Sequence, residues 1–397
     1  MNLISLKLTF AALFVLALGT FVSVSFSAVS HILFVIPGLY FFYLDFIKKE
    51  RPIHFSVSSK FLLVMVATMI LSVLANTDII DRPLSNISKV KYFLIPWLGV
   101  FAVQRLIDDY LTPKRARILL NTFLIATSIA TVSGLIALKT GFNPIKMKDA
   151  CHPSRACGLF GMYMTYGYGI SLFATLLTVS LLLKNKFLSV KIIIPSTVLA
   201  VIGTILSYAR GGWIGYIAGV SSFFFRKNTK VFLIFLAISA SIFAGVLKFS
   251  PTVNNMFFNR AESNSQRIAF YKTAYIAFRE KPFFGWGYRN FESNVKEIKK
   301  KHDIAYPEFG GHAHNNLLEH LASTGGLGFL ATIAFFMAWL FESYRRDDFI
   351  GKVTFSFVVS FLVSGMFQYT FGDGENLFLI MGIWMLSQLR GNNVRLD

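Results

Sequence analysis

Long apolar segments separated by shorter polar connections run along almost the whole chain. A helix that crosses the hydrocarbon core of a membrane needs about 20 such residues, and fewer where neighbouring helices pack around it. Twelve segments fit, at roughly 8–26, 29–47, 61–75, 92–104, 118–138, 159–183, 192–208, 212–225, 231–249, 323–341, 353–370 and 376–389. Because backbone polar groups cannot remain unpaired in lipid, these spans must be helical. The pattern predicts an all-α polytopic membrane protein with about 12 transmembrane helices.

One polar stretch is far longer than the other connections and divides the chain into three regions. Residues 1–249 are predicted to hold transmembrane helices 1–9, and residues 250–322 to form a large loop with amphipathic helices. Residues 323–397 are predicted to hold helices 10–12 and a short tail. The first apolar segment, which follows Lys7, also resembles a secretory signal peptide. Because the apolar pattern resumes at once and continues for eleven more segments, an uncleaved first span is expected.

The composition agrees with a membrane protein and narrows its partners. Hydrophobic residues make up 54% of the chain and charged residues 15%, and the mean hydropathy is +0.58. Soluble domains carry about 25% charged residues, so a soluble multidomain enzyme is excluded, as is a disordered or collagen-like chain. Lys and Arg outnumber Asp and Glu by 39 to 20, a net charge of +19. An anionic partner is therefore expected, which in a membrane means a lipid-linked phosphate rather than a nucleic acid.

The basic residues of the short connections indicate the orientation, because Lys and Arg are enriched on the cytoplasmic side. With a cytoplasmic N-terminus, the inner connections and chain ends hold 20 of the 39 basic residues. The short outer connections hold 8, and the other 11 lie in or beside 250–322. Both termini are therefore expected in the cytoplasm of a bacterial cell, and the large loop in the periplasm.

The 250–322 segment is the one region long enough for a soluble substructure. A helix is predicted from Ser263 or Asn264 to about Arg279. Its apolar stripe comprises Ile268, Tyr271, Ala274, Tyr275 and Phe278. A short helix is predicted at 294–302, and the three lysines at 299–301 are interpreted as a solvated charged face. After Pro307, two glycines lead into a helix that enters the membrane.

Arginines in the expected outer connections are candidates for anion binding, because a charge at a span end is costly to desolvate. Arg155 precedes the sixth span, Arg210 lies in the short connection after the seventh, and Arg267 opens the predicted amphipathic helix. Guanidinium groups bind phosphate through paired hydrogen bonds, so several together suit a pyrophosphate. The glycines after Arg210 are expected to let a large ligand approach the backbone. Arg279 and Arg289 fit snorkelling toward lipid headgroups, with Arg289 kept as a candidate substrate contact.

His312 and His314 lie just before the tenth span, where loop and membrane meet. Histidine is a common general base at neutral pH, so His314 is the candidate base for a substrate hydroxyl. His312 and Asn315 are candidate substrate contacts, and Glu319 is interpreted as a structural partner. A metal site is not favoured, because no cysteine and only scattered carboxylates accompany the two histidines. The ordinary alternative is a pair of structural histidines.

Two further features of the outer connections are interpreted locally. Cys151 and Cys157 flank Arg155 in a compartment that favours disulfides. They are expected either to form a disulfide that closes a short loop around Arg155 or to remain a free buried pair. Asp373 and Glu375, in the last outer connection, are interpreted as a solvated turn.

The sequence around His314 resembles a motif of the bacterial O-antigen ligases. His314 and Asn315, nine further residues, Gly325, two residues and Gly328 match the pattern H-[N/S/Q]-x9-G-x-x-[G/T/Y]. O-antigen polymerases and protein O-oligosaccharyltransferases belong to the same superfamily.

The arginines extend this resemblance over roughly residues 150–330. Arg155 is similar to the family's arginine before a glycine-rich span, and Arg210 in SYARGGW to its S-x-x-R-G element. Arg267, with the following KPFFGWG, is similar to the R…P-x-x-G-x-G element that opens the family's large periplasmic loop.

The resemblance implies a glycosyltransferase of the GT-C type. Such enzymes transfer O-antigen from undecaprenyl pyrophosphate to the outer core of lipid A-core in the periplasm, without ATP, metal or another cofactor. It assigns Arg155, Arg210 and Arg267 to the pyrophosphate, with Arg210 as a catalytic residue, and His314 to the acceptor hydroxyl as general base. Attack from the face opposite the leaving group predicts inversion at the anomeric carbon.

The same residues are also compatible with other functions. An O-antigen polymerase needs the same charges and arginines, and only the His-Asn-x9-Gly pattern favours a ligase. A protein O-oligosaccharyltransferase is usually longer, with an added periplasmic domain. A flippase for lipid-linked oligosaccharides also needs a basic cavity, but it would show repeats and charges within its spans, and neither is prominent here. A purely structural scaffold is the least favoured reading.

Overall fold

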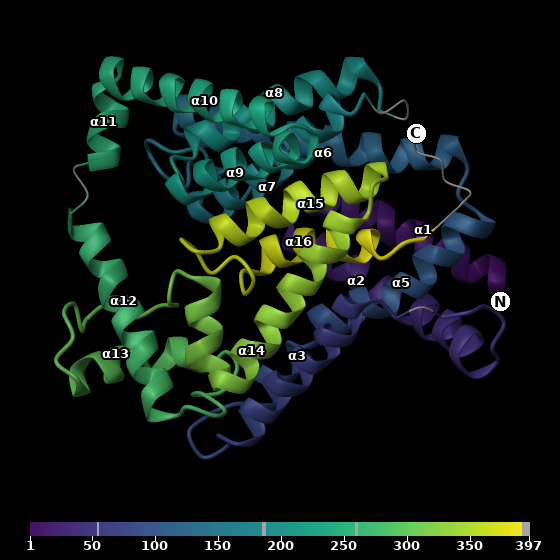
Figure 1. Ribbon diagram of the computed structural model, residues 1–397, viewed down its shortest axis with the longest axis horizontal. Helices are drawn as coiled ribbons and strands as arrows, with labels where there is room; N and C mark the ends of the chain where they lie inside the picture. Colours follow the sequence, from purple (N-terminus) through teal and green to yellow (C-terminus); the bar gives the residue numbers. More distant parts are fainter. Residues whose placement is uncertain (54, 185–187, 259–260, 391–397) are drawn as a thin grey trace.

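The computed structural model describes residues 1–53, 55–184, 188–258 and 261–390, and these residues are almost entirely helical (Figure 1). The tail predicted after Arg390 and part of the connection at 184–191 lie outside the described residues. The α-helices of the described part are α1 Asn2–Gly19, α2 Val24–Phe42, α3 Val57–Leu74, α4 Pro83–Ser88, α5 Lys91–Asp109, α6 Pro113–Thr140, α7 Tyr163–Leu182, α8 Val190–Leu206, α9 Arg210–Lys227, α10 Thr229–Phe249, α11 Pro251–Phe258, α12 Ala261–Glu280, α13 Phe291–Lys301, α14 Asn316–Arg345, α15 Phe349–Ser364 and α16 Gly374–Ser387. A π-helical turn, η1 (Tyr43–Ile47), continues α2, and β1 (Phe142–Asn143) pairs antiparallel with β2 (Lys148–Asp149).

The prediction of an all-α membrane protein is confirmed, and every predicted span overlaps a helix. Eight helical segments of the described residues are long and apolar enough to cross a membrane: Asn2–Gly19, Val24–Ile47, Val57–Leu74, Pro83–Asp109, Pro113–Thr140, Tyr163–Leu182, Thr229–Phe249 and Asn316–Arg345. Helices α8, α15 and α16 are apolar but shorter, and α9 carries Arg210, Arg226 and Lys227. The chain is therefore a polytopic membrane protein.

Two helices differ in extent from the spans predicted over them. The span predicted at 323–341 is the second part of α14, which begins at Asn316 and bends at Gly325. The span predicted at 353–370 ends at Ser364, and the chain then runs without a helix to α16. Asn316 binds this stretch, because its N–H donates to Gly365 O at 2.7 Å and its Oδ1 accepts from Phe371 N–H at 3.0 Å. These tertiary bonds replace the helical bonds that the apolar sequence suggested.

Close packing of aromatic side chains holds the bundle together. Helix α3 packs along α14, and α9 packs against α15 and α7, while α1, α2 and α5 form a neighbouring group. In Figure 1, α12, α13 and the start of α14 lie at one end of the body and the chain termini at the other. The core includes Phe335, Trp339, Phe361, Phe371 and Trp384, none more than 1% exposed. In lipid such van der Waals packing, rather than burial from water, drives helix association.

Helices α12 and α13 have a small core of their own, which they share with the start of α14. It comprises Phe270, Ala274, Ala277, Phe291, Val295, Ile298, Ala313 and Ala322. The two helices predicted in 250–322 are thereby confirmed, at 261–280 and 291–301. The predicted apolar stripe of α12 is buried only in part, since Ala274 is fully buried whereas Ile268 and Tyr275 are each 54% exposed. The helix instead turns its small residues, such as Ala277, toward α13 and α14 because they allow close approach.

A glycine kink joins the turn at 281–287 to α14. Gly325 has φ +66° and ψ −168°, a conformation that is essentially restricted to glycine. The bend lets Gly326 N–H donate to Pro282 O at 2.7 Å. A Cβ atom at Gly325 would lie 2.4 Å from Phe283 O, and one at Gly285 would lie 2.5 Å from Gly325 N. The glycines of the two sequence motifs therefore hold the turn against the helix that follows the histidines.

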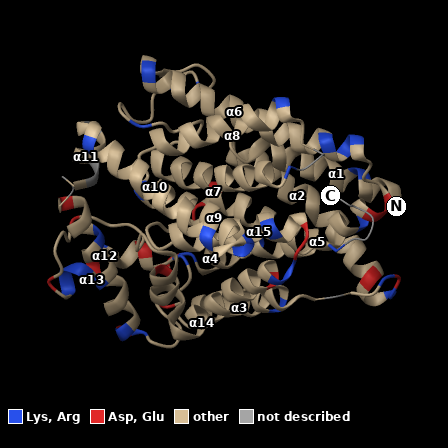
Figure 2. Cartoon of the chain, turned by 45° about the horizontal axis from the view of Figure 1, so that its top comes forward, with Lys and Arg blue, Asp and Glu red and all other residues tan. Residues whose placement is uncertain are grey.

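Charged residues are concentrated outside the apolar middle of the bundle. Figure 2 shows them around α11–α13 and near the chain termini, whereas α7 carries none. Near the termini, Arg105 is buried and forms an ion pair with Asp45, while Arg51 pairs with Asp108 at 2.9 Å. The basic residues around α12 make fewer such pairs, and these are the residues that the sequence assigned to function.

Candidate functional site

Three arginines from separate parts of the chain converge. Arg155 lies in the loop before α7, Arg210 is the first residue of α9, and Arg267 lies in α12. The charges of Arg267 and Arg155 both act on Arg210, so Arg210 lies within electrostatic range of each of the other two. Within the described residues, neither Arg155 nor Arg267 forms an ion pair with a carboxylate. Like charges gathered in this way suit a multiply charged anion, which would relieve their repulsion.

A disulfide and an aromatic ring hold Arg155 in place. Cys151 and Cys157 form a disulfide, which confirms that alternative of the sequence analysis. The guanidinium of Arg155 lies 4.2 Å from the centre of the Tyr163 ring, and the residue is only 8% exposed. Its Nε has no hydrogen-bond partner in the described part of the chain. A buried guanidinium with an unused donor is prepared to bind an acceptor that enters the site.

The backbone around Arg210 is fixed by close packing against α7. A Cβ atom at Gly211 would lie 2.2 Å from Tyr168 Oη, and one at Gly212 would lie 3.0 Å from Gly167 O. The expectation that these glycines open the backbone to a large ligand is therefore wrong. They are needed because α7 occupies that space, and the guanidinium rather than the backbone of Arg210 is left to meet a ligand.

Helix α12 connects the arginines to the histidines. Arg210 Nη2 donates to Asn264 Oδ1 at 3.0 Å, which ties the start of α9 to the first turn of α12. Asn264 was predicted as a helix cap, but α12 begins earlier, at Ala261. Arg267 follows Asn264 by three residues, and its charge acts on both His312 and His314. Five of the residues singled out in the sequence therefore form one cluster.

Gln368, which was not predicted from the sequence, lies between the two histidine rings. His314 Nδ1 lies 2.8 Å from Gln368 Oε1, and Gln368 Nε2 lies 3.3 Å from His312 Nε2. The ring centres are 4.3 Å apart, and His312 Nδ1 accepts from His314 N–H at 3.1 Å. His314 has φ +49°, an uncommon conformation for a residue with a side chain. No local signal identified Gln368, because it lay in a segment interpreted as a membrane span.

The surroundings of these rings favour their neutral form. Burial lowers the pKa of His314 from the usual 6.5, the Gln368 hydrogen bond opposes this, and the charges of Arg267 and Lys299 reinforce it. Burial, with His314 and Arg267, lowers the pKa of His312 to about 3. Both rings are therefore uncharged at neutral pH, and a neutral imidazole has one nitrogen that can accept a proton.

Asn315 fixes the start of α14. Its Oδ1 accepts from the N–H groups of Leu317 and Leu318 at 2.9 and 3.0 Å, the bonding pattern of a helix N-cap. Its Nδ2 donates to Met366 O at 3.0 Å. The side chain thus holds the helix and the 365–373 connection together directly beside His314, and the substrate contact predicted for Asn315 stays a prediction.

The prediction of a solvated face at 299–301 is wrong for Lys299. Lys299 is fully buried, and its Nζ donates to Phe309 O at 3.0 Å and to Tyr306 O at 3.3 Å. The same ammonium lies 3.7 Å from the ring centre of Phe270, whose ring is 5.3 Å from that of His314. Two carbonyls and an aromatic face replace the water that the ammonium loses on burial. Lys299 thereby supports the wall behind His314.

Glu319 holds the backbone between the two histidines. Its carboxylate is 2% exposed and accepts from Ala313 N–H at 2.7 Å and from the Ser323 hydroxyl at 3.3 Å. This confirms its interpretation as a structural partner. A residue in the first turn of α14 thus fixes the segment that precedes the helix.

Arg289 borders the cluster, and Asp373 differs from expectation. Arg289 is exposed, donates to Gly372 O at 3.4 Å, and interacts with Tyr369, whose ring centre lies 5.8 Å from that of His312. Asp373 is not part of a freely solvated turn. Burial and the adjacent Glu375 carboxyl raise the pKa of Asp373 to about 7.

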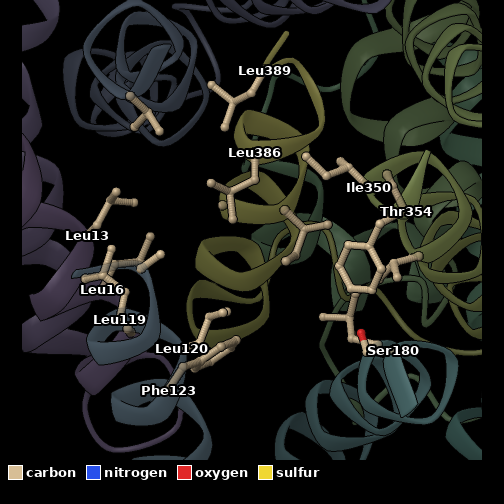
Figure 3. A pocket seen from close by; sticks show the side chains of 18 of the residues that line it. Leu13, Leu16, Leu119, Leu120, Phe123, Ser180, Ile350, Thr354, Leu386 and Leu389 are labelled. Carbon is tan, nitrogen blue, oxygen red and sulfur yellow. The ribbon is translucent and has the colours of Figure 1, made fainter. Parts of the chain in front are cut away.

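An apolar cavity lies apart from the cluster. Its volume is about 520 Å³, and it lies among α1, α5, α6, α7, α15 and α16. Figure 3 shows Leu13, Leu16, Leu120, Leu386 and Leu389 pointing into it. None of the arginines or histidines of the cluster lines it. In addition, no group of three or more His, Cys, Asp or Glu positioned for a metal occurs among the described residues.

The fold and the cluster together define a polytopic all-α membrane protein with a basic polar site assembled from several connections. Residues 195–333 match the family model described as O-antigen ligase, and the chain contains this domain. O-antigen ligases and polymerases share the domain, which indicates a glycan-transferring enzyme. An uncharacterized protein of Haemophilus influenzae is 27% identical over 323 residues, which cover 75% of each chain. The matched domain includes Arg210, Arg267 and both histidines, and it ends before Gln368.

Proposed function

We propose that this protein is an O-antigen ligase, which transfers O-antigen from undecaprenyl pyrophosphate to the outer core of lipid A-core in the periplasm. The observation that carries the proposal is the convergence of Arg155, Arg210 and Arg267 beside the neutral His314. One part of the cluster suits a pyrophosphate and the other a sugar hydroxyl. Both parts are needed for the transfer of a glycan from a lipid pyrophosphate to a hydroxyl group of another sugar.

The arginines are assigned to the leaving group. As the bond between the anomeric carbon and the pyrophosphate breaks, negative charge develops on the pyrophosphate oxygen. Guanidinium groups already in place stabilise that charge without reorganising, which is often the largest single contribution to catalysis. Arg210 is the central member, because it interacts with both of the other arginines and is held by Asn264.

His314 is assigned as the general base. When His314 Nδ1–H donates to Gln368 Oε1, the lone pair of Nε2 can take the proton of the acceptor hydroxyl. The acceptor oxygen then forms its bond to the anomeric carbon from the face opposite the pyrophosphate, so the configuration inverts. The electron pair of the broken bond stays with the pyrophosphate. The step uses side chains alone, and both ring nitrogens of His312 already face protein partners.

We further propose a twelve-span topology with both termini in the cytoplasm and 250–322 in the periplasm. The eight long helices would be joined by α8, α9, α15 and α16, of which the shortest, α16, has 14 residues. At 1.5 Å per residue, α16 extends about 21 Å, so it depends on the surrounding helices to shield its ends. The distribution of basic residues, 20 inside against 8 in short outer connections, supports this orientation.

The second candidate is an O-antigen polymerase, which the shared domain favours equally. A polymerase would use the same arginines for the pyrophosphate of its donor, but its acceptor would be a second lipid-linked repeat unit. A flippase for lipid-linked oligosaccharides, from a different class, would need the arginines without a base.

The deciding experiment is a lipopolysaccharide gel of cells deleted for this gene, with the carrier lipid extracted in parallel. Naked lipid A-core together with long O-antigen on undecaprenyl pyrophosphate is the result expected of a ligase. Core bearing a single repeat unit would instead identify a polymerase, and an unchanged ladder would overturn both. Complementation with His314→Ala should leave less than about a tenth of transfer, since a general base contributes ~10²–10⁴ in rate.

A further inference from the structure

The apolar cavity of Figure 3 has one charged end. Most of its wall consists of aliphatic side chains, and the charged residues that line it are Arg346, Asp348 and Arg390. The guanidinium of Arg346 is engaged by partners within the chain. It pairs with Asp348 at 2.7 Å and donates to Ser387 O and Leu389 O at 2.9 and 2.8 Å. These bonds join the end of α14 to the end of α16 and so form part of the cavity wall.

The remaining charge at this end is positive. The side chain of Arg390 forms neither a hydrogen bond nor an ion pair with the described residues, and Arg390 is exposed. The first turn of α6 contributes Ala116 to the wall, while the neighbouring Lys114, Arg115 and Arg117 do not line the cavity, and Asp108 and Asp109 at the end of α5 pair with Arg51. The cavity therefore combines an apolar interior with one exposed guanidinium, that of Arg390, at its charged end.

An empty space of this size inside the bundle is unfavourable. Side chains around a void lose van der Waals contacts, and water is not stabilised in a cavity that offers it few polar partners. The volume of about 520 Å³, at about 30 Å³ for one water-sized group in a liquid, corresponds to roughly 17 such groups. One acyl chain of a phospholipid has this size, whereas a whole undecaprenyl chain is several times too long.

We propose that the cavity binds one acyl chain of an anionic phospholipid, with the headgroup phosphate beside Arg390. Lipid hydrocarbon is the solvent of this protein and fills the apolar interior, while the guanidinium of Arg390 favours a negatively charged headgroup. The site lies outside the arginine and histidine cluster. This inference therefore goes beyond the proposed glycan transfer and does not depend on it.

The test uses the full-length protein and does not use transfer activity. The protein is extracted from the membrane in styrene–maleic acid particles, moved into detergent, and analysed by native mass spectrometry for retained lipid. The melting temperature is then measured with added dioleoyl phosphatidylglycerol and, separately, with dioleoyl phosphatidylcholine. We expect about one retained phosphatidylglycerol per chain and a saturable rise in Tm that phosphatidylcholine produces only at higher concentration.

The variants separate this cavity from the general lipid surface. Leu386→Trp fills the cavity from α16, and Leu120→Trp fills it from α6 if the first variant does not fold. Leu330→Trp is the matched control, because Leu330 is 63% exposed and does not line the cavity. The cavity-filling variants should lose both the retained phosphatidylglycerol and the rise in Tm with added lipid. The control variant should keep both. Arg390→Gln should lower the affinity for phosphatidylglycerol by about fivefold, since one cation near an anionic lipid contributes about 1 kcal/mol. The affinity for phosphatidylcholine should stay unchanged.

Three results would overturn the proposal. They are unchanged lipid retention in the cavity-filling variants, equal affinity for the two phospholipids in the unaltered protein, and recovery of an isoprenoid lipid in place of a phospholipid.

Discussion

The guanidinium of Arg210 is the side chain around which the candidate site is organised. It interacts electrostatically with Arg155 and Arg267, which come from segments distant in sequence, and it donates to Asn264. Residues of one charge do not gather in a folded protein without a reason, since their repulsion destabilises the fold. The reason proposed here is a pyrophosphate that the protein binds during its reaction.

Replacing Arg210 by Lys tests whether charge alone is sufficient. Lysine keeps the positive charge but loses the planar fork that binds phosphate through two hydrogen bonds. We expect Arg210→Lys to lower kcat for transfer by roughly tenfold or more, measured with purified protein, lipid-linked donor and lipid A-core. Arg51→Lys is the matched control, because Arg51 lies near the chain termini, where it pairs with Asp108. Unchanged turnover in Arg210→Lys would mean that this residue only attracts the donor.

Gln368 should determine the pH range over which His314 is a base. In Gln368→Glu, the carboxylate accepts from both rings, which keeps the Nδ1–H form of His314. Its negative charge also raises the pKa of His314 against the lowering by burial, Arg267 and Lys299. A base is active only when unprotonated, so the acidic limb of the kcat profile should move to higher pH, with activity retained above it.

The pH profiles of two other variants complete this test. Gln388→Glu adds the same charge in contact with Ser56 and Ser387 instead of a histidine, and should leave the profile unchanged. Gln368→Met keeps the size without the hydrogen bonds and should lower kcat at every pH. A profile of Gln368→Glu that coincides with the unaltered protein would exclude a hydrogen-bonded His314 base.

Lys299 should stabilise the segment that carries the histidines. Lys299→Met removes the ammonium that donates to the carbonyls of Tyr306 and Phe309, and a hydrogen bond from a charged donor contributes about 1.5–3 kcal/mol. We expect a lower Tm in detergent and a lower kcat. Lys300→Met, at the exposed neighbouring position, should change neither. Equal melting temperatures for the two variants would show that the buried ammonium contributes nothing.

At the scale of elements, the kink in α14 connects the two sequence motifs. Gly325 belongs to the histidine motif and Gly285 to the KPFFGWG motif, and their backbones are in contact. The contact sets where α14 begins relative to the turn at 281–287, and so where His314 lies relative to α12. Motifs separated by about 40 residues in the sequence thereby act as one structural unit.

Gly325→Ala should disrupt the contact between the turn at 281–287 and α14. The added Cβ would lie 2.4 Å from Phe283 O, and alanine does not readily adopt φ +66°. Strain of this kind costs of order 1–3 kcal/mol, so we expect a lower Tm and a loss of transfer activity. Gly245→Ala is the control, because it lies within α10 with open space around it and alanine favours helices. A Gly325→Ala protein with the stability of the control would contradict the role assigned to the kink.

At the scale of the whole molecule, the proposed topology can be tested by labelling from outside the cell. Lys300→Cys lies on the exposed side of α13, and Lys114→Cys lies exposed at the start of α6. The cysteines at 151 and 157 are paired and should not react. A membrane-impermeant maleimide should label Lys300→Cys in intact cells and Lys114→Cys only after the membrane is broken. Labelling of both, or of Lys114→Cys alone, would refute the orientation.

The sequence by itself determined the class of the protein and most of the helices. Apolar length requires a helical membrane protein, because lipid offers no partner to a free backbone group. Residue chemistry also picked out Arg155, Arg210, Arg267, His312 and His314, since charged and titratable groups beside membrane spans need a reason to be there.

Only the tertiary structure decided which residues meet and what surrounds them. Gln368 and Lys299 escaped the sequence analysis, because a glutamine in an apolar run and a lysine in a row of lysines carry no local sign of burial. The glycines after Arg210 likewise proved to serve the packing of α7 rather than a ligand. Such roles depend on neighbours that are distant in sequence, and packing alone brings those neighbours together.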